Sequence, residues 1–390
     1  MKSSRTMHGK AITTFTPSRT APTPLIAGIR RPEGHDGIQP RAKPWVAAAT
    51  RVVSPNGARE RRRRIMGALI ALTTLLCLAP PIHASNPDAP TLIIAQGADG
   101  APEYGKQFTE WRTRLAEAGQ RGGAIVHILA PDAPGAPNAD DLTTKDRLKS
   151  LLDAESKQTP HALWLVLIGH GTFDGREARF NLEGPDLTAD ELSQWLTPFE
   201  RTVVLINCSS SSAPFLKLAG GDRIVITATK SGYELNFSRF GEYLSQAVAA
   251  PDADLDKDGQ TSLLEAFLLA SRRTSEFYES DRRLATEQAL LDDNGDGLGT
   301  PAAFFRGVRA VKKPQDNAAA DGLRAHQLHL VPSQRERDMP PQIREKRNAL
   351  ELAIAKLRDR KSEMEEDAYY AELEKLAVEL AKLYDGLESP

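Results

Sequence analysis

Cysteine is nearly absent from this chain, which contains only Cys77 and Cys208. Because Cys77 lies in a segment that we expect to be removed, the mature protein would carry a single thiol. One thiol excludes an intramolecular disulfide, so Cys208 is expected to be either buried and inert or free and reactive.

An excess of charge of one sign is also lacking, since the formal net charge is −2. The basic runs lie within the first 64 residues, where targeting explains them. No basic face indicates nucleic-acid binding. We therefore expect no nucleic-acid partner.

The chain has no long hydrophobic run near its start. The apolar stretch 65–79 is too short to span a bilayer comfortably. It follows four arginines at 61–64 and precedes a plausible cleavage site after Ala84. This pattern predicts a signal peptide at residues 61–84 and export to the periplasm or the exterior. A membrane anchor is expected only if the signal stays uncleaved, and a lipoprotein is disfavoured because Leu76 is bulky.

Residues 1–60 show no sustained hydrophobic period. They are rich in Pro, Arg, Thr and Ala and carry too little patterned apolar surface to fold alone. We expect a disordered leader, or a true start site just before the arginine run.

The body of the chain alternates apolar strands with amphipathic helices. Strands are predicted at 91–95, 124–129, 163–168, 202–206 and 223–229, with helices between them. Thr188 with Glu191 forms a capping box that opens one of these helices. This order predicts an α/β fold with a mostly parallel sheet and helices on both faces.

Two of these strands end in residues that carry chemistry. The run 163–168 leads into Gly169-His170-Gly171, and 202–206 leads into Asn207-Cys208-Ser209. In open α/β sheets, sites lie just beyond the carboxyl ends of the strands. A thiol beside an imidazole can form a nucleophilic thiolate near neutral pH. Each residue alone is more often structural, but together they favour a catalytic pair.

This pattern resembles the caspase-like cysteine peptidases, which include caspases, metacaspases, gingipains and legumain. The resemblance covers about residues 90–250 and is greatest to the legumain-type branch and its bacterial relatives. Further residues that carry it are Leu92, Tyr104, the run 226–229, Glu234 and the run 240–244. It implies a caspase-like three-layer sandwich and a peptide or protein substrate.

The resemblance also implies roles for individual residues. Cys208 would attack the scissile carbonyl, His170 would protonate the leaving amine, and the N–H groups of Gly171 and Cys208 would hold the oxyanion. Glu234 is a candidate for lining the substrate pocket, although a solvated loop carboxylate is as good an interpretation.

The chain departs from the family pattern at three places. Asn207 replaces the usual Ala, four serines follow Cys208, and Leu235 and Asn236 lie near the serines of the legumain specificity pocket. A catalytically inactive relative that serves as a calcium-stabilised interaction module is therefore the alternative, and an acyl transferase is a third, weaker one.

A second motif predicts calcium binding within residues 251–305. Asp254, Asp256 and Asp258 match ligand positions one, three and five of an EF-hand loop, and Gly259 permits the sharp turn. The remaining positions are supplied by Gln260 (backbone carbonyl), Ser262 (through water) and Glu265 (bidentate). An acidic solvated turn would explain the carboxylates but not the offsets of Gly259 and Glu265.

A further acidic turn contains Asp292, Asn294 and Asp296. It matches the first half of such a loop, but Ala303 occupies the twelfth position. A second ion site and an Asx-rich turn are equally good interpretations.

The C-terminal part reads as a separate unit. Residues 306–341 are predicted as a linker. Residues 342–388 are predicted as a helical hairpin or short coiled coil, because leucines recur at alternating spacings of three and four. Its apolar seams indicate a possible protein partner.

Overall fold

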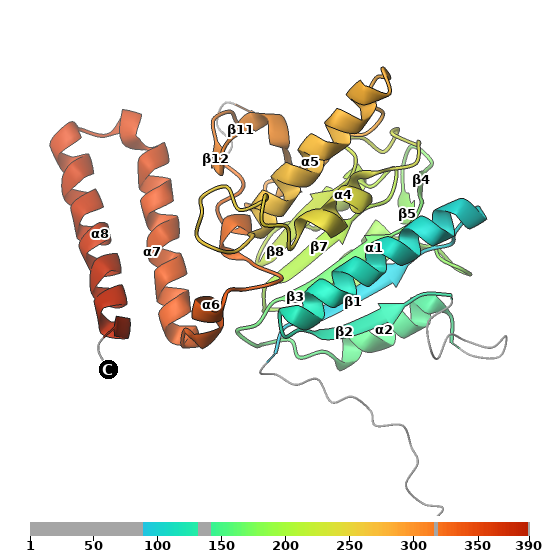
Figure 1. The fold of residues 1–390 in the computed structure, drawn as a ribbon, viewed down its shortest axis with the longest axis horizontal. Coiled ribbons are helices and arrows are strands. Elements are labelled where there is room, and N and C mark those ends of the chain that lie inside the picture. The colour runs from blue at the N-terminus through green and yellow to red at the C-terminus, as the bar shows by residue number, and fades with distance from the viewer. Residues whose placement is uncertain (1–88, 132–141, 316–318, 389–390) are drawn as a thin grey trace, which may run out of the picture. The chain divides into compact units, whose positions relative to one another are not determined.

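The computed structural model describes residues 89–131, 142–315 and 319–388 (Figure 1). The predicted leader (1–60), the signal peptide (61–84) and Cys77 lie outside the described residues. No helix in the described part of the chain has both the length and the apolar character needed to cross a membrane.

A seven-stranded sheet forms the centre of the fold, in the order β10-β9-β8-β7-β3-β1-β2. Five strands are parallel: β1 (Thr91–Gln96), β2 (Ile125–Leu129), β3 (Leu163–Ile168), β7 (Val203–Asn207) and β8 (Arg223–Thr227). At one edge, β9 (Leu290–Asp292) and β10 (Thr300–Pro301) run antiparallel. The predicted mostly parallel sheet is confirmed.

Both faces of the sheet are buried, which explains the continuous apolar runs of the strands. One face packs against α1 (Pro102–Arg121), α4 (Phe240–Ala247) and α5 (Leu263–Ser280). The other face packs against α2 (Thr144–Ala154), α3 (Ala189–Leu196) and the 3₁₀ turn η1 (Ala213–Leu218). The predicted three-layer α/β architecture is confirmed.

Side-chain capping fixes where three of these helices begin. Thr143, Thr188 and Ser262 each accept the N–H of the residue three positions on. The acidic side chain of that residue in turn accepts the backbone N–H of the capping residue. The capping box expected at Thr188 is confirmed. The box at Ser262 uses Glu265, so one residue both starts α5 and closes the acidic loop before it.

A small antiparallel sheet follows β3 directly. It contains β4 (Gly171–Phe173), β5 (Ala178–Phe180) and β6 (Leu187–Thr188). The apolar pattern did not predict it, because its strands are two or three residues long. It begins at Gly171, so it fixes the chain just after His170.

The C-terminal part begins with short elements. They are η2 (Ala302–Phe304), β11 (Phe305–Arg306), β12 (Arg309–Ala310), η3 (Ala325–Gln327) and α6 (Gln334–Asp338). The interpretation of 306–341 as a linker is wrong for much of this range. Asp321, Ala325 and Leu330 are buried, and Leu263 donates its N–H to the carbonyl of Leu328. The polar composition of this range led to the linker interpretation, although residues 325–330 pack beside the first turn of α5.

Two long helices end the chain, as predicted. α7 (Pro341–Asp359) and α8 (Glu366–Glu388) form a hairpin around the turn η4 (Lys361–Glu363) (Figure 1). Leu350, Ile354 and Leu357 of the predicted α7 seam are buried.

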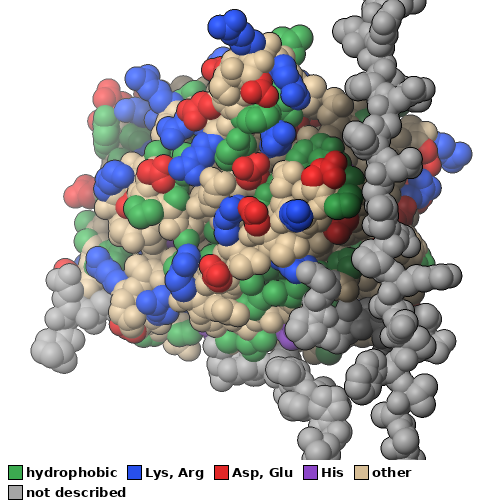
Figure 2. Space-filling view, turned by 45° about the vertical axis from the view of Figure 1, so that its right-hand side comes forward, with side chains coloured by type: hydrophobic (Ala, Val, Ile, Leu, Met, Phe, Trp, Pro, Cys, Tyr) green, Lys and Arg blue, Asp and Glu red, His purple; other side chains and the backbone are tan. Residues whose placement is uncertain are grey.

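On the face shown in Figure 2, basic and acidic side chains are interspersed.

Candidate active site

His170 and Cys208 follow neighbouring strands at the same edge of the sheet. β3 pairs in parallel with β7, with Leu167 opposite Asn207. Cys208 extends this pairing, because its N–H donates to the carbonyl of Leu167 at 2.9 Å. The strand-end positions inferred from the sequence therefore coincide in space.

His170 is half-buried in an aromatic pocket. Its ring lies edge-on to Tyr104 and Phe108 of α1, with centroid distances of 5.1 and 5.3 Å, and 6.0 Å from Phe237. Its Nε2 lies 3.2 Å from the carbonyl oxygen of Asp99. Because a carbonyl can only accept, Nε2 carries the proton, and a neutral ring then has its lone pair on Nδ1.

Cys208 points into the packed layer between the sheet and its helices. It is 1% exposed and belongs to the same core cluster as Trp111 and Phe240. Burial raises the pKa of its thiol far above the ordinary value, and the negative charge of Glu287 raises it further. Within the described residues, no hydrogen bond joins Cys208 to His170. The structure thus places the two residues at one edge without forming an activated pair.

Both backbone donors expected to hold an oxyanion are occupied. The N–H of Cys208 is used in the sheet, and the N–H of Gly171 donates to the hydroxyl of Ser210 at 3.2 Å. Ser210 returns a bond to the carbonyl of Gly171 at 3.1 Å. A Cβ at position 171 would lie 2.2 Å from the carbonyl oxygen of Ser210, so only glycine fits this contact.

The four serines after Cys208 form a buried turn, which we call the serine turn (Ser209–Ser212). Asn207 holds its start, because its Oδ1 accepts the N–H and the hydroxyl of Ser209. Ser212 holds its end through the N–H groups of Ala228 and Thr229. The departures from the family pattern at Asn207 and the serines therefore have one structural role, which is to close this turn.

The loop 230–239 lies against the serine turn and His170. Glu234 accepts the N–H of Ser211 with its carbonyl, while its side chain accepts the N–H groups of Lys230 and Gln288. The carboxylate expected to line a pocket thus bonds to backbone within and beside its own loop. Phe237 stacks on Tyr104 at a centroid distance of 4.5 Å and borders His170.

Sequence reasoning missed Glu287, which is 4% exposed. Its carboxylate accepts bonds from Ser238, Arg239, Phe240 and Tyr278. Burial raises its pKa above the ordinary value despite these bonds. Glu287 lies in no motif, and only its partners, nine to 49 residues away, reveal its role.

The acidic loop before α5 has the turns of a calcium-binding loop. Gly259 donates its N–H to Asp254 at 3.2 Å, and Asp258 and Gln260 donate theirs to Asp256 and Asp258. Gly259 has φ of +90°, the left-handed conformation that the sixth position requires. Oxygen atoms of Asp254, Asp256 and Asp258 lie within 4.8 Å of one another.

One observation tests whether these residues fit a cation. Oδ1 of Asp254 is buried and accepts no hydrogen bond, although buried carboxylate oxygens are normally paired. Glu265 is 1% exposed, and its Oε1 reaches the N–H groups of Leu255 and Asp256 inside the loop. A hard cation such as Ca²⁺ takes oxygen ligands of this kind, so the residues fit it. Gln260 and Ser262 occupy the remaining expected positions, and Ser262 binds Glu265.

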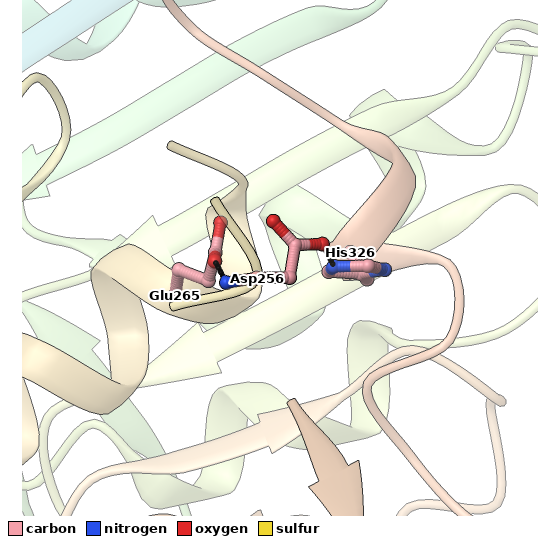
Figure 3. Close-up of side chains that lie close together, drawn as sticks. All are labelled: Asp256, Glu265 and His326. Atoms are coloured by element: carbon pink, nitrogen blue, oxygen red, sulfur yellow. Dashed lines mark hydrogen bonds and ion pairs between the residues drawn. The ribbon is translucent and has the colours of Figure 1, made fainter. Parts of the chain in front are cut away.

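A histidine adjoins this loop from the C-terminal segment (Figure 3). Nε2 of His326 in η3 lies 3.0 Å from Oδ2 of Asp256. Asp256, Glu265 and His326 each place one ligand atom within 4.8 Å of the others. The segment 306–341 therefore contacts a side chain of the acidic loop through His326.

The second acidic turn has similar backbone bonds. Both oxygens of Asp292 accept N–H groups, from Gly295 and Gly297, and Asn294 accepts the N–H of Asp296. Asp292 is fully buried at the end of β9. These bonds fit an Asx-rich turn and would also preform the first half of an ion site.

No family model matches the chain, and no curated protein matches it. Among solved structures, the initiator caspase Dronc of Drosophila is similar over 53% of this chain and 80% of its own, with 14% identity and a TM-score of 0.35. Caspase-1 of Spodoptera frugiperda is similar over 54% and 88%, with 10% identity and a TM-score of 0.34. A secreted C11 cysteine protease of Bacteroides thetaiotaomicron is similar over 53% and 66%, with 9% identity and a TM-score of 0.33. Scores and identities this low say nothing of activity.

Proposed function

We propose that this protein is a cysteine peptidase with Cys208 as nucleophile and His170 as its acid–base partner. The observation that carries the proposal is the pairing of β3 with β7, which sets both residues at one carboxyl edge of the sheet. The arrangement described above, in which Cys208 is buried and the N–H of Gly171 is bonded to Ser210, would then be a resting form of the peptidase.

The chemistry assigned to the pair is acyl transfer. The thiol gives its proton to Nδ1 of His170, and Sγ forms a bond to the scissile carbonyl carbon. The imidazolium then returns the proton to the amine as the C–N bond breaks. Water hydrolyses the thioester, which releases the acid and restores the thiol. Gly171 is the proposed oxyanion donor once its N–H is freed.

We further propose that the protein is exported and binds Ca²⁺. Asp254, Asp256, Asp258 and Glu265 would hold the ion with Gln260 and Ser262, and the unpaired Oδ1 of Asp254 supports this assignment. The ion would fix the loop between α4 and α5 and take no part in bond breaking. The second turn, with Asp292, Asn294 and Asp296, is proposed only as an additional ion site.

A second candidate function is a catalytically silent module that binds a protein partner. The full burial of Cys208 favours it, as does the use of both expected oxyanion donors within the fold. The α7/α8 hairpin would be the element that meets the partner.

The pH dependence of thiol alkylation distinguishes the two candidates. The reaction at Cys208 would be followed peptide by peptide in the full chain, with and without Ca²⁺, in the wild type and in His170→Ala. His127→Ala, a histidine in the middle of β2, is the matched control. A peptidase predicts reaction below the ordinary thiol pKa of about 8.5 that is lost only in His170→Ala.

The opposite result would overturn the peptidase proposal. If Cys208 reacts only when the protein unfolds, and His170→Ala changes nothing, then the thiol is a packing residue. Hydrolysis of a peptide library, compared between the wild type and Cys208→Ala, would provide an independent answer.

A further inference from the structure

The serine turn and the adjoining Asn207 contain three unfavourable features within five residues. Nδ2 of Asn207 and Oγ of Ser211 are buried and have no hydrogen-bond partner. Ser211 also adopts φ of +54°, a left-handed conformation that a serine rarely takes. Unpaired buried polar groups and left-handed residues persist only where surrounding contacts enforce them.

Besides the bonds of Asn207 and Ser212 at its two ends, three hydrogen bonds hold the middle of the turn against the rest of the site. Ser210 bonds to both the N–H and the carbonyl of Gly171, and Ser211 donates its N–H to the carbonyl of Glu234. These bonds join the turn after Cys208 to the chain after His170 and to the loop 230–239. The same bond from Gly171 to Ser210 uses the N–H that an oxyanion would need.

We propose that the serine turn is an autoinhibitory latch, in which the hydroxyl of Ser210 holds the site closed by occupying Gly171. The inhibitory role of the turn rests on the proposed peptidase function, whereas its opening and closing do not. When the Ser210–Gly171 bonds break, the turn moves away and the N–H of Gly171 becomes free. Cys208 directly precedes the turn, so it moves with the turn out of its place beneath α1 and α4 and becomes accessible.

The unfavourable features explain why such a latch can open without global unfolding. An open turn would hydrate Nδ2 of Asn207 and Oγ of Ser211, and it would let Ser211 leave the left-handed region. Opening therefore loses bonds but relieves burial and backbone strain within the same few residues. A turn whose bonds were all satisfied would lack this compensation.

Native-state alkylation tests the latch directly. Iodoacetamide reaction at Cys208 would be measured in the full chain at one pH, with Cys77 quantified as a separate peptide. Ser210→Ala removes the latching hydroxyl and both of its bonds to Gly171. We expect alkylation to be faster by at least about fivefold to tenfold, which is the factor for losing a single hydrogen bond. The urea midpoint of each variant would be measured alongside, to separate turn opening from global unfolding.

Two substitutions at the next serine serve as controls. Ser211→Ala removes a buried hydroxyl that has no partner, so the closed turn loses one unfavourable feature and we expect alkylation no faster than in the wild type. Ser211→Gly relieves the left-handed strain of the closed turn, so we expect slower alkylation. An unchanged rate in Ser210→Ala, or equal acceleration in Ser211→Ala, would overturn the latch.

The result also separates the latch from the peptidase function. If Ser210→Ala exposes Cys208 but hydrolyses no peptide, and His170→Ala does not alter the exposed thiol, the latch stands and the peptidase proposal fails. If Ser210→Ala does not speed alkylation, the latch fails, and the His170→Ala comparison in the wild type still decides the function.

Discussion

The carboxylate of Glu287 accepts the backbone N–H of Phe240 at 3.1 Å, although the two residues are 47 positions apart in the chain. The same carboxylate accepts the N–H of Arg239 at 2.8 Å and the hydroxyl of Ser238 at 2.6 Å. Glu287 thus caps the first turn of α4. Without it, the N–H groups of this turn would be buried without an acceptor, which is costly. It also fixes the end of the loop that carries Phe237 to His170.

We expect Glu287→Ala to destabilise the protein by about 2–3 kcal/mol, because several buried donors lose a charged acceptor. Glu287→Gln keeps the shape and one acceptor, so we expect a smaller loss. Urea unfolding monitored by tryptophan fluorescence would measure both values. Equal losses in the two variants would contradict this, because they would show that the acceptor retained by glutamine contributes nothing to the cap.

The raised pKa of Glu287 predicts a pH dependence of known sign. Burial raises its folded-state pKa above the ordinary 4.5, so the folded state favours the protonated form relative to the unfolded chain. The associated stability is fully present below the ordinary value and is lost as pH rises through the folded value. The difference in unfolding free energy between the wild type and Glu287→Gln should therefore shift against the wild type as pH rises over this window. A pH-independent difference would contradict this.

A buried ion pair at the opposite end of the strands predicts a larger effect. Arg201 lies 3.1 Å from Glu155 with side chains 1% and 6% exposed, and it also donates to the carbonyl of His161 at 2.8 Å. Glu155→Ala would leave a buried, unpaired guanidinium, so we expect a loss of about 3–5 kcal/mol in unfolding free energy.

An exposed pair provides the contrast for this measurement. Lys149 and Asp153 are paired on α2 with side chains 40% and 61% exposed. We expect Lys149→Ala to change stability by about 1 kcal/mol or less. If Glu155→Ala were no more destabilising than Lys149→Ala, the buried pair would not be a net contributor.

Sequence reasoning succeeded where a local pattern has one physical meaning. Runs such as 163–168 are apolar at every position, and only a strand buried on both faces uses all of them. The capping box of Thr188 and Glu191 fixes backbone geometry within a few residues. The structure confirms these strands and this box, with differences of only a few residues at the ends of the elements.

The sequence could not predict how the site is closed. The contact of Ser210 with Gly171 spans 39 residues, and the contacts of Glu287 with 238–240 span 47 to 49. Such bonds depend on which strands become neighbours in the sheet. No local sequence pattern determines that order. Burial of Cys208 has the same origin, because its cover comes from α1 and α4.

The acidic loop predicts a calcium-dependent gain in stability. At 100 times the dissociation constant, an ion that binds only the folded state adds about 2.7 kcal/mol. Asp254→Asn should lose this gain, because it removes the charge on the unpaired Oδ1. It should still fold without the ion, since an amide oxygen can accept the N–H of Gly259 as the carboxylate does now.

The control for this experiment lies two residues earlier. Asp252 is outside the loop and pairs with Arg273 at 2.7 Å, so Asp252→Asn should keep the calcium response. Thermal unfolding with Ca²⁺ and with a chelator would measure all three proteins, and calorimetric titration would count one ion or two. An equal response in Asp254→Asn would refute the first loop as the binding site.

A buried ion pair joins the C-terminal hairpin to the segment before it. Arg347 of α7 donates to Glu336 of α6 at 2.8 Å, and their side chains are 9% and 7% exposed. Arg347→Ala would leave Glu336 buried without its cation, so we expect α6 and the first turns of α7 to loosen. The pair belongs to α6 and α7 and not to the central sheet, so the cooperative unfolding of the sheet should keep its midpoint. Hydrogen exchange would report faster exchange in residues 334–350 alone.

Two further variants decide what holds α7 in place. Arg347→Lys keeps the charge but not the bidentate hydrogen bonding to Glu336, so we expect hydrogen exchange between that of the wild type and that of Arg347→Ala. Lys346→Ala changes an exposed neighbour and should leave exchange unaltered. If Arg347→Ala also left exchange unaltered, the apolar seam of Leu350, Ile354 and Leu357 would be sufficient to hold the helix, and the ion pair would not stabilise the hairpin.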